Sequence, residues 1–270
     1  MDEDDSLVEP TLAFYENWKG NQLFYWQGRV VVSKTQWKNC IGTVLFISAV
    51  VGVFIYTAWL AKLSTTSMVF VGLMYLNSLV WFAWTAFMDP GFVPRHYERL
   101  PAAEDERFCT FCEVVKPPRR SHCRVCECCI DQFDHHCPWT GNCVGRRNYR
   151  SFIGFLLSLV ALDIYMLATI TTFAVQYIFS EGHDVHKFLE EFWLIPVLVY
   201  ITGSTGCLLT AFLVYHLQLI TKNMTTNELI RERTRANLQS SSDEDINRRP
   251  SSCSQWRQNW RRFFTSPIPP

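Results

Sequence analysis

Four long and almost uncharged apolar runs constrain the fold of this chain more than any other feature. They extend over Cys40–Ala61, Met68–Met88, Ser151–Phe179 and Phe192–Ile220. Each has the roughly 20 residues that a helix needs to cross the apolar core of a bilayer. A soluble domain of 270 residues would have too little polar chain left to cover four such helices. We therefore predict an all-α integral membrane protein with four transmembrane helices.

The basic residues predict how these helices cross the membrane. The segment before the first run holds 4 Lys and Arg, the segment between the second and third runs holds 10, and the tail after the fourth holds 9. The two remaining short loops hold one each, Lys62 and Lys187. Because Lys and Arg concentrate in cytosolic loops, both termini and the middle segment are predicted to be cytosolic. Cysteines there stay reduced, so a metal-binding or catalytic role is favoured over disulfides.

Five segments follow from this pattern. Residues 1–39 form a cytosolic N-terminal segment, 40–88 the first two transmembrane helices and 89–150 a cytosolic cysteine-rich insert. Residues 151–220 form the third and fourth transmembrane helices, and 221–270 a cytosolic tail. Within the tail, residues 236–255 are typical of a flexible linker. Residues 256–264 interleave Trp and Phe with Arg, which favours a short helix on the membrane surface or docked on the protein. The formal net charge of zero argues against a nucleic-acid partner.

The insert is dominated by potential metal ligands. Eight of the 11 cysteines lie between Cys109 and Cys143. Cys-x2-Cys pairs bend the backbone so that both thiolates can reach one tetrahedral Zn²⁺, and the soft ligands suffice for two closed sites with at least one cysteine to spare. An insert of this size has too few aliphatic residues to build its own core, so structural zinc is expected. The spacing leaves open whether His135 or His136 is a ligand, and whether Cys128 or Cys129 is.

A spare cysteine also indicates chemistry. Residues 134–137 read Asp-His-His-Cys, and a thiol beside imidazole and carboxylate groups can be held as an activated thiolate. A ubiquitin ligase of the RING type would need a second closing Cys-x2-Cys pair, but within the insert only Cys143 follows Cys137.

From Phe108 to Phe155 the chain resembles the cysteine-rich domain of the Asp-His-His-Cys (DHHC) protein S-acyltransferases, which are integral-membrane palmitoyltransferases. The resemblance rests on these residues: Cys109, Cys112, Lys116–Arg119, Ser121–Cys123, Cys126, Cys129, Phe133–Trp139, Asn142–Gly145 and Asn148–Tyr149. Two further signatures of the family lie where they are expected, Asp89–Gly91 after the second run and Thr225–Glu228 after the fourth.

The resemblance implies a role for each ligand. One zinc would be held by Cys109, Cys112, His122 and Cys129, and the other by Cys123, Cys126, His136 and Cys143. Cys137 would then be the free nucleophile, with His135 as its base and Asp134 orienting His135. Thr226 and Glu228 would pack against this region, with Thr226 near Asp134.

The implied function is transfer of a palmitoyl group from palmitoyl-CoA to protein cysteine thiols, through an acyl-enzyme on Cys137 with ping-pong kinetics. The implied partners are the membrane, long-chain acyl-CoA, and cytosolic or peripheral membrane proteins with an accessible cysteine. The Golgi or the endoplasmic reticulum is the expected location, with the plasma membrane as an alternative. Residues 20–29 resemble a Ras-palmitoyltransferase-like subgroup that works with a small accessory subunit. The alternative function is a non-enzymatic zinc-bearing membrane adaptor, which has no need for an unligated cysteine beside a histidine.

Six residues carry further hypotheses. Arg119, Arg120, Arg146 and Arg147 could hold the phosphates of coenzyme A or could simply be positive-inside charges. Asp163, inside the third run, favours a structural hydrogen bond to another helix. Cys253 in the tail could itself be acylated.

Overall fold

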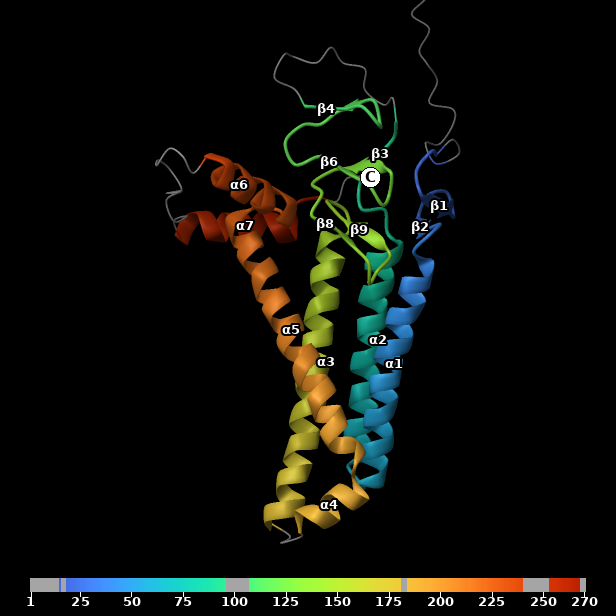
Figure 1. Cartoon of the computed structure of the whole chain (residues 1–270), viewed down its shortest axis with the longest axis vertical. Coiled ribbons are helices and arrows are strands. Elements are labelled where there is room, and N and C mark those ends of the chain that lie inside the picture. Colours follow the sequence, from blue (N-terminus) through green and yellow to red (C-terminus); the bar gives the residue numbers. More distant parts are fainter. Residues whose placement is uncertain (1–14, 16–17, 96–106, 181–183, 240–252, 268–270) are drawn as a thin grey trace, which may run out of the picture.

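The computed structural model describes residue 15 and residues 18–95, 107–180, 184–239 and 253–267. A stem of long helices carries a head of small hairpins at one end (Figure 1). The long helices are α1 (Trp37–Leu60), α2 (Thr65–Phe87), α3 (Tyr149–Val175, extended by the π-helical turn η1, Gln176–Ser180) and α5 (Leu194–Lys222). These four helices are long and apolar enough to cross a membrane. They confirm the four predicted spans, each to within three residues at either end.

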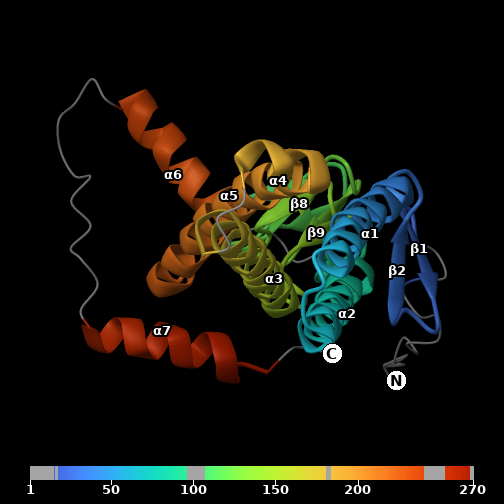
Figure 2. The ribbon, with the colours of Figure 1, turned by 90° about the horizontal axis from the view of Figure 1, so that it is seen from below.

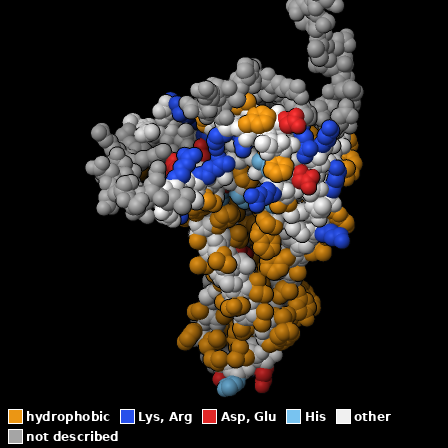
Figure 3. All heavy atoms as spheres, turned by 45° about the horizontal axis from the view of Figure 1, so that its top comes forward, with side chains coloured by type: hydrophobic (Ala, Val, Ile, Leu, Met, Phe, Trp, Pro, Cys, Tyr) orange, Lys and Arg blue, Asp and Glu red, His pale blue; other side chains and the backbone are white. Residues whose placement is uncertain are grey.

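The stem is apolar outside as well as inside. A buried cluster that includes Phe54, Val71, Leu162, Met166 and Leu198 joins all four helices. Large apolar side chains also cover the outer surface of the stem, as Figure 3 shows. Such a surface is unfavourable in water and matches the interior of a bilayer. The protein is therefore a multi-pass membrane protein. At the far end of the stem, the short helix α4 (Val185–Glu191) joins η1 to α5.

The head consists of very short antiparallel hairpins rather than a single sheet. Strands β4 (Phe108–Cys109) and β5 (Val114–Val115) pair with each other, and so do β8 (His135–Cys137) and β9 (Asn142–Val144). Strand β7 (Cys128–Ile130) lies between β3 (Phe92–Val93) and β6 (Ser121–Cys123). Cysteines supply most of the buried interior of this region. Two- and three-residue strands need another source of stability, which agrees with a metal-stabilised insert.

An N-terminal hairpin, which the sequence pattern did not predict, packs on this head. Its strands are β1 (Gln22–Tyr25) and β2 (Val30–Ser33), and the chain then enters α1. The backbone amide of Asn21 donates to the Cys126 carbonyl at 3.1 Å, and the Gln22 side chain donates to the same oxygen at 3.2 Å. Phe24 and Trp18 pack against Phe92 of β3. Residues 18–33 are therefore part of the head.

Two helices follow α5. Helix α6 (Thr226–Gln239) projects away from the bundle, as the view along the stem in Figure 2 shows, and α7 (Cys253–Thr265) contains the helix predicted at 256–264. Asn259 donates to the Thr221 carbonyl of α5 at 2.8 Å, so α7 docks on the protein. The predicted linker at 236–255 needs a correction, because α6 continues to Gln239 and α7 starts at Cys253. Helix α6 begins with a hydrogen bond from the Leu229 amide to the Thr225 carbonyl, and the charged residues that follow stay helical as far as Gln239. Residues 240–252 lie outside the described residues.

Candidate active site and metal centres

Side chains alternate between the two faces of a strand, and this alternation decides which ligands belong to the first cluster. His122 and Cys123 are neighbours in β6, so their side chains leave opposite faces of the strand. His122 pairs across the hairpin with Cys129 of β7. Its Nδ1 atom lies 3.6 Å from Cys109 Sγ and 3.3 Å from Cys112 Sγ. The ligand atoms of Cys109, Cys112, His122 and Cys129 all lie within 4.8 Å of one another, and we call this set cluster 1.

The second cluster is built in the same way around β8. His136 lies opposite Cys143 of β9. The Nδ1 atom of His136 lies 3.4 Å from Cys143 Sγ and 3.5 Å from Cys126 Sγ. Cys123, from the other face of β6, completes cluster 2, whose ligand atoms again lie within 4.8 Å of one another.

The donor sets of both clusters fit Zn²⁺. Tetrahedral Zn²⁺ with bonds of about 2.3 Å to sulfur and about 2.1 Å to nitrogen requires ligand–ligand distances of roughly 3.5–3.8 Å. The recorded distances of 3.3–3.6 Å are close to this range. Each Cys-x2-Cys turn is followed by a left-handed residue, Glu113 or Glu127, each with φ of 54°, which wraps the backbone around the ligand pair. In addition, His136 Nε2 lies 2.9 Å from Gln36 Oε1, which orients the ring as second-layer partners of metal-bound histidines do.

Strand geometry also bears on the two alternatives that spacing left open. His135 and Cys137 are two residues apart in β8 and share the face opposite to His136. Cys128 pairs with Cys123 rather than with His122, and its thiol faces Gln22 Oε1 at 4.0 Å. His136 and Cys129 are therefore brought into the clusters, whereas His135, Cys137 and Cys128 lie outside them.

Asp134, His135 and Cys137, here called the Asp-His-Cys trio, form a hydrogen-bonded group beside cluster 2. His135 Nδ1 lies 2.8 Å from Asp134 Oδ2, and the backbone amide of Thr226 donates to Asp134 Oδ1 at 2.8 Å. Asp134 is 2% exposed and Cys137 is 6% exposed. Thr226, at the start of α6, therefore holds the carboxylate oxygen that His135 does not contact, and Glu228 pairs with Arg119 of the head at 3.3 Å.

The electrostatics of the trio favour a charged pair. Burial alone would raise the pKa of the Cys137 thiol, but its hydrogen bond with His135 and the charge of that ring hold the pKa below its usual value. Burial acts to lower the pKa of His135, yet the hydrogen bonds to Asp134 and Cys137 raise it to about 9. Burial would likewise raise the pKa of Asp134, and its bonds to His135 and Thr226 keep it lowered. The arrangement thus favours a thiolate beside an imidazolium.

Comparison with known proteins agrees with this arrangement. Residues 102–233 match the family model described as DHHC palmitoyltransferase. The chain belongs to the DHHC palmitoyltransferase family.

Several named relatives show the extent of the similarity. The chain is 29% identical to "Probable protein S-acyltransferase 7" of Arabidopsis thaliana, over 85% of this chain and 60% of that protein. It is 28% identical to "Palmitoyltransferase ZDHHC18" of Mus musculus, over 80% of this chain and 64% of that protein. It is 34% identical to "Palmitoyltransferase ZDHHC8" of Homo sapiens, over 66% of this chain and 25% of that protein. The matches thus span less than two thirds of the length of these relatives.

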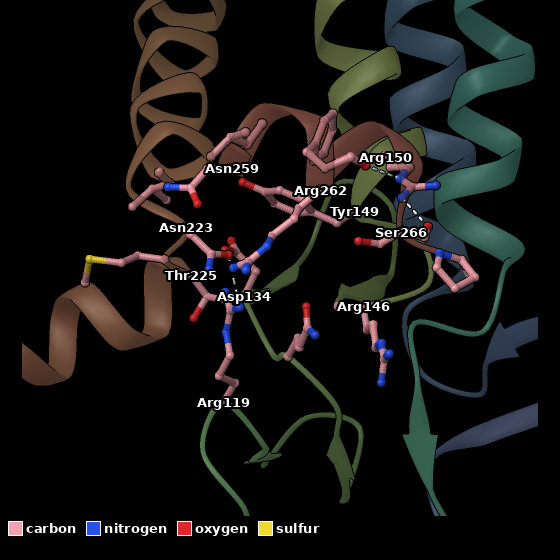
Figure 4. Close-up of a pocket in the computed structure, with 17 residues that line it drawn as sticks. Arg119, Asp134, Arg146, Tyr149, Arg150, Asn223, Thr225, Asn259, Arg262 and Ser266 are labelled. Carbon is pink, nitrogen blue, oxygen red and sulfur yellow. Dashed lines mark hydrogen bonds between the residues drawn. The ribbon is translucent and has the colours of Figure 1, made fainter. Parts of the chain in front are cut away.

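A polar pocket of about 300 Å³ lies beside the trio in this DHHC protein (Figure 4). It is bounded by the head, the ends of α3 and α5, and α7, and four arginines contribute to its lining: Arg119, Arg146, Arg150 and Arg262. Of the four arginines considered for phosphate binding, Arg119 and Arg146 line this pocket. Arg120 and Arg147 instead form ion pairs with Asp131 and Asp89. Two of the four predicted arginines therefore line the pocket, whereas Arg120 and Arg147 form ion pairs within the insert.

Sequence reasoning missed a second histidine at the site. His216 of α5 is fully buried, and its Nδ1 atom lies 3.1 Å from the Tyr149 hydroxyl. One ligand atom each from His216, Asp134 and His135 lie within 4.8 Å of one another. A signal was present, because an ionisable residue inside an apolar run usually faces a partner or a functional site.

The interhelical hydrogen bond predicted for Asp163 is also present. Thr205 Oγ1 of α5 donates to Asp163 Oδ2 of α3 at 3.0 Å.

Proposed function

We propose that this protein is a protein S-acyltransferase that moves a palmitoyl group from palmitoyl-CoA to cysteine thiols of other proteins. The observation that carries the proposal is a buried cysteine outside both metal clusters that shares a strand face with His135, which is itself bonded to Asp134. An unligated thiolate held beside an imidazolium is a nucleophile, and family membership supports acyl transfer as its use.

The first half of the reaction forms an acyl-enzyme. The Cys137 proton passes to His135, and the thiolate attacks the thioester carbonyl of the acyl-CoA. A bond forms between Cys137 Sγ and the carbonyl carbon, the carbon–sulfur bond to coenzyme A breaks, and His135 returns the proton to the departing thiolate. Asp134 holds the imidazole in the tautomer that performs both steps and stabilises its charge.

The second half releases the product. A substrate cysteine gives its proton to His135 and attacks the acyl-enzyme, so the acyl group moves to that cysteine and Cys137 is restored. In each half-reaction one thioester bond breaks and another forms, so the transfer needs no further energy source. Ping-pong kinetics follow because coenzyme A leaves before the acceptor thiol reacts.

The helices would supply the site for the acyl chain. Cys137 belongs to a buried cluster with Phe152 and Leu156 of α3 and Leu213 of α5, so the thiol lies where the head meets the stem. Burial of an acyl chain among apolar helices is favourable by about 0.8 kcal/mol per CH₂ group. The arginines of the neighbouring pocket are suited to the phosphates of the donor.

The metal ions would stabilise the hairpins of the head and would take no part in acyl transfer. Each cluster offers four protein ligands and so would form a closed, structural zinc site. Bound zinc would fix the hairpins that hold β8 against the helices.

The basic residues support a cytosolic position for the head, and the donor and the acceptor proteins are expected there. A Golgi or endoplasmic reticulum membrane, or the plasma membrane, would be the location, and a small accessory subunit would be an additional partner.

The test uses the purified full chain in detergent with radiolabelled palmitoyl-CoA. Wild-type protein should take up label that hydroxylamine removes, and Cys137→Ser should take up none. Cys207→Ser changes an exposed cysteine of α5 and should label as the wild type does. Equal labelling of wild type and Cys137→Ser would reject Cys137 as the nucleophile, and no labelling of the wild type would favour the adaptor function.

A further inference from the structure

His216 is completely buried, and one of its two ring nitrogens lacks a hydrogen-bond partner among the described residues. It lies six residues before the end of α5 and is surrounded by aromatic rings, the nearest being Phe212 at 4.6 Å and Phe152 at 5.1 Å between ring centroids. The Nε2 atom of His216 has no hydrogen-bond partner among the described residues. A buried polar atom without a partner destabilises the folded state, so its presence calls for an explanation.

The surroundings of His216 point toward Asp134. A carboxylate can accept about four hydrogen bonds, and Asp134 has one from His135 and one from Thr226. A ligand atom of His216 lies within 4.8 Å of those of Asp134 and His135. Two hydrogen bonds of about 2.8 Å that meet at one water molecule span about 4.6 Å. The separation therefore suits a contact between His216 and Asp134 that one water bridges.

Tyr149 determines which nitrogen of His216 can donate. Its hydroxyl lies 3.1 Å from His216 Nδ1. When this hydroxyl donates to Nδ1, the single proton of a neutral imidazole resides on Nε2. The ring then presents an N–H donor, which complements a carboxylate and not an imidazolium.

We propose that His216 is a positioning residue for acyl transfer, which acts through Asp134. Tyr149 fixes the tautomer of His216, and Nε2–H donates through a water molecule to the Asp134 carboxylate. This bond holds the carboxylate in the orientation that its contact with His135 requires. Helix α5 thereby supports the trio from within the stem, while Thr226 supports it from the start of α6. The inference rests on the proposed acyltransferase function.

The first test compares two replacements of His216 in the full-length protein. His216→Phe keeps the ring volume and removes the donor, whereas His216→Gln can present an N–H group near the position of Nε2. Acyl-enzyme formation at saturating palmitoyl-CoA should be slower by about ten-fold in His216→Phe and by less than about three-fold in His216→Gln. The palmitoyl-CoA concentration that gives half of the maximal rate should change little. His186→Phe, at an exposed position of α4, is the matched control and should react as the wild type does.

The second test removes only the Tyr149 hydroxyl. Tyr149→Phe should slow the same step, and adding it to His216→Phe should slow the reaction no further, because both act on one chain of hydrogen bonds. Tyr200→Phe, on the exposed face of α5, is its control.

Zinc content and thermal melting report whether each variant is folded. If His216→Phe loses zinc or melts early, Tyr149→Phe decides the question, since it deletes a single oxygen atom. Wild-type rates in Tyr149→Phe, equal rates in His216→Phe and His216→Gln, or multiplicative effects in the double variant would overturn the inference. A wild type that forms no acyl-enzyme would instead reject the proposed function itself.

Discussion

His135 and His136 are neighbours in the sequence, yet β8 directs their side chains to opposite sides. His136 meets Cys143 across the β8–β9 hairpin and enters cluster 2, while His135 bonds Asp134. The period of two along a strand is the physical cause of this separation. Spacing between cysteines and histidines cannot reveal it, because residues 134–137 carry no other sign of a strand. The resemblance to the DHHC family supplied the assignment that spacing alone left open.

Alanine substitutions at these two positions should therefore have different effects on metal content. His135→Ala should retain both zinc ions and lose acyl-enzyme formation, because His135 lies outside both clusters. His136→Ala should lose the zinc of cluster 2 and lose activity as well, because the frame that holds β8 depends on that site. Mass spectrometry of the metal in each purified variant measures this. Equal zinc content in the two variants would contradict the separation of roles.

The elements of the stem and of the head differ in how far sequence predicts them. The four spans could be located because a run of some 20 apolar residues has few alternatives to a membrane helix. The hairpins of the head could not, because strands of two or three residues leave no period to detect. The β1–β2 hairpin was missed for a related reason, since its contacts are with Cys126 and Phe92, which are distant in sequence. His216 was overlooked because its partners come from α3 and β8.

The β8–β9 turn offers a prediction at the scale of an element. Gly141 in this turn has φ of +60°, and a Cβ atom there would lie 2.8 Å from the Gln36 carbonyl oxygen and 2.9 Å from Cys40 Sγ. Gly141→Ala should destabilise the protein by about 1–3 kcal/mol, because it combines backbone strain with a clash against α1. Gly42→Ala is the control, since no atom lies within 4 Å of its Cβ position in α1. Thermal melting in detergent should show a lower midpoint for Gly141→Ala alone; an unchanged midpoint would argue against this turn geometry.

The whole molecule is held together where the head meets the stem. The Asn142 side chain donates to the carbonyls of Ala86 and Met88 at 3.0 and 2.9 Å, and Asn148 donates to that of Thr85 at 3.0 Å. These carbonyls belong to the end of α2, where the helix itself supplies no partners. On the other side, Arg150 donates to the Phe263 carbonyl of α7 at 2.5 Å. The hairpins of the head, the long helices and α7 thus converge on the region around Cys137.

The docking of α7 should accordingly be measurable across the whole molecule. Asn259 is buried, and Asn259→Ala removes its bond to Thr221 and should release α7 from α5. We expect faster limited proteolysis of the tail and several-fold slower acyl-enzyme formation, because α7 closes one side of the polar pocket. Gln258→Ala, at an exposed position of the same helix, should change neither property. Equal proteolysis of the two variants would contradict a structural role for this contact.

The proposal that Cys137 carries the acyl group is tested most directly by mapping the adduct. The full-length protein is mixed with palmitoyl-CoA, quenched in acid within its first turnover and digested, and its cysteine peptides are examined by mass spectrometry. We expect a palmitoyl thioester on Cys137 before any other cysteine, and none on a cysteine of cluster 1 or cluster 2. An adduct that forms first on another cysteine, with Cys137 unmodified throughout, would contradict the proposal.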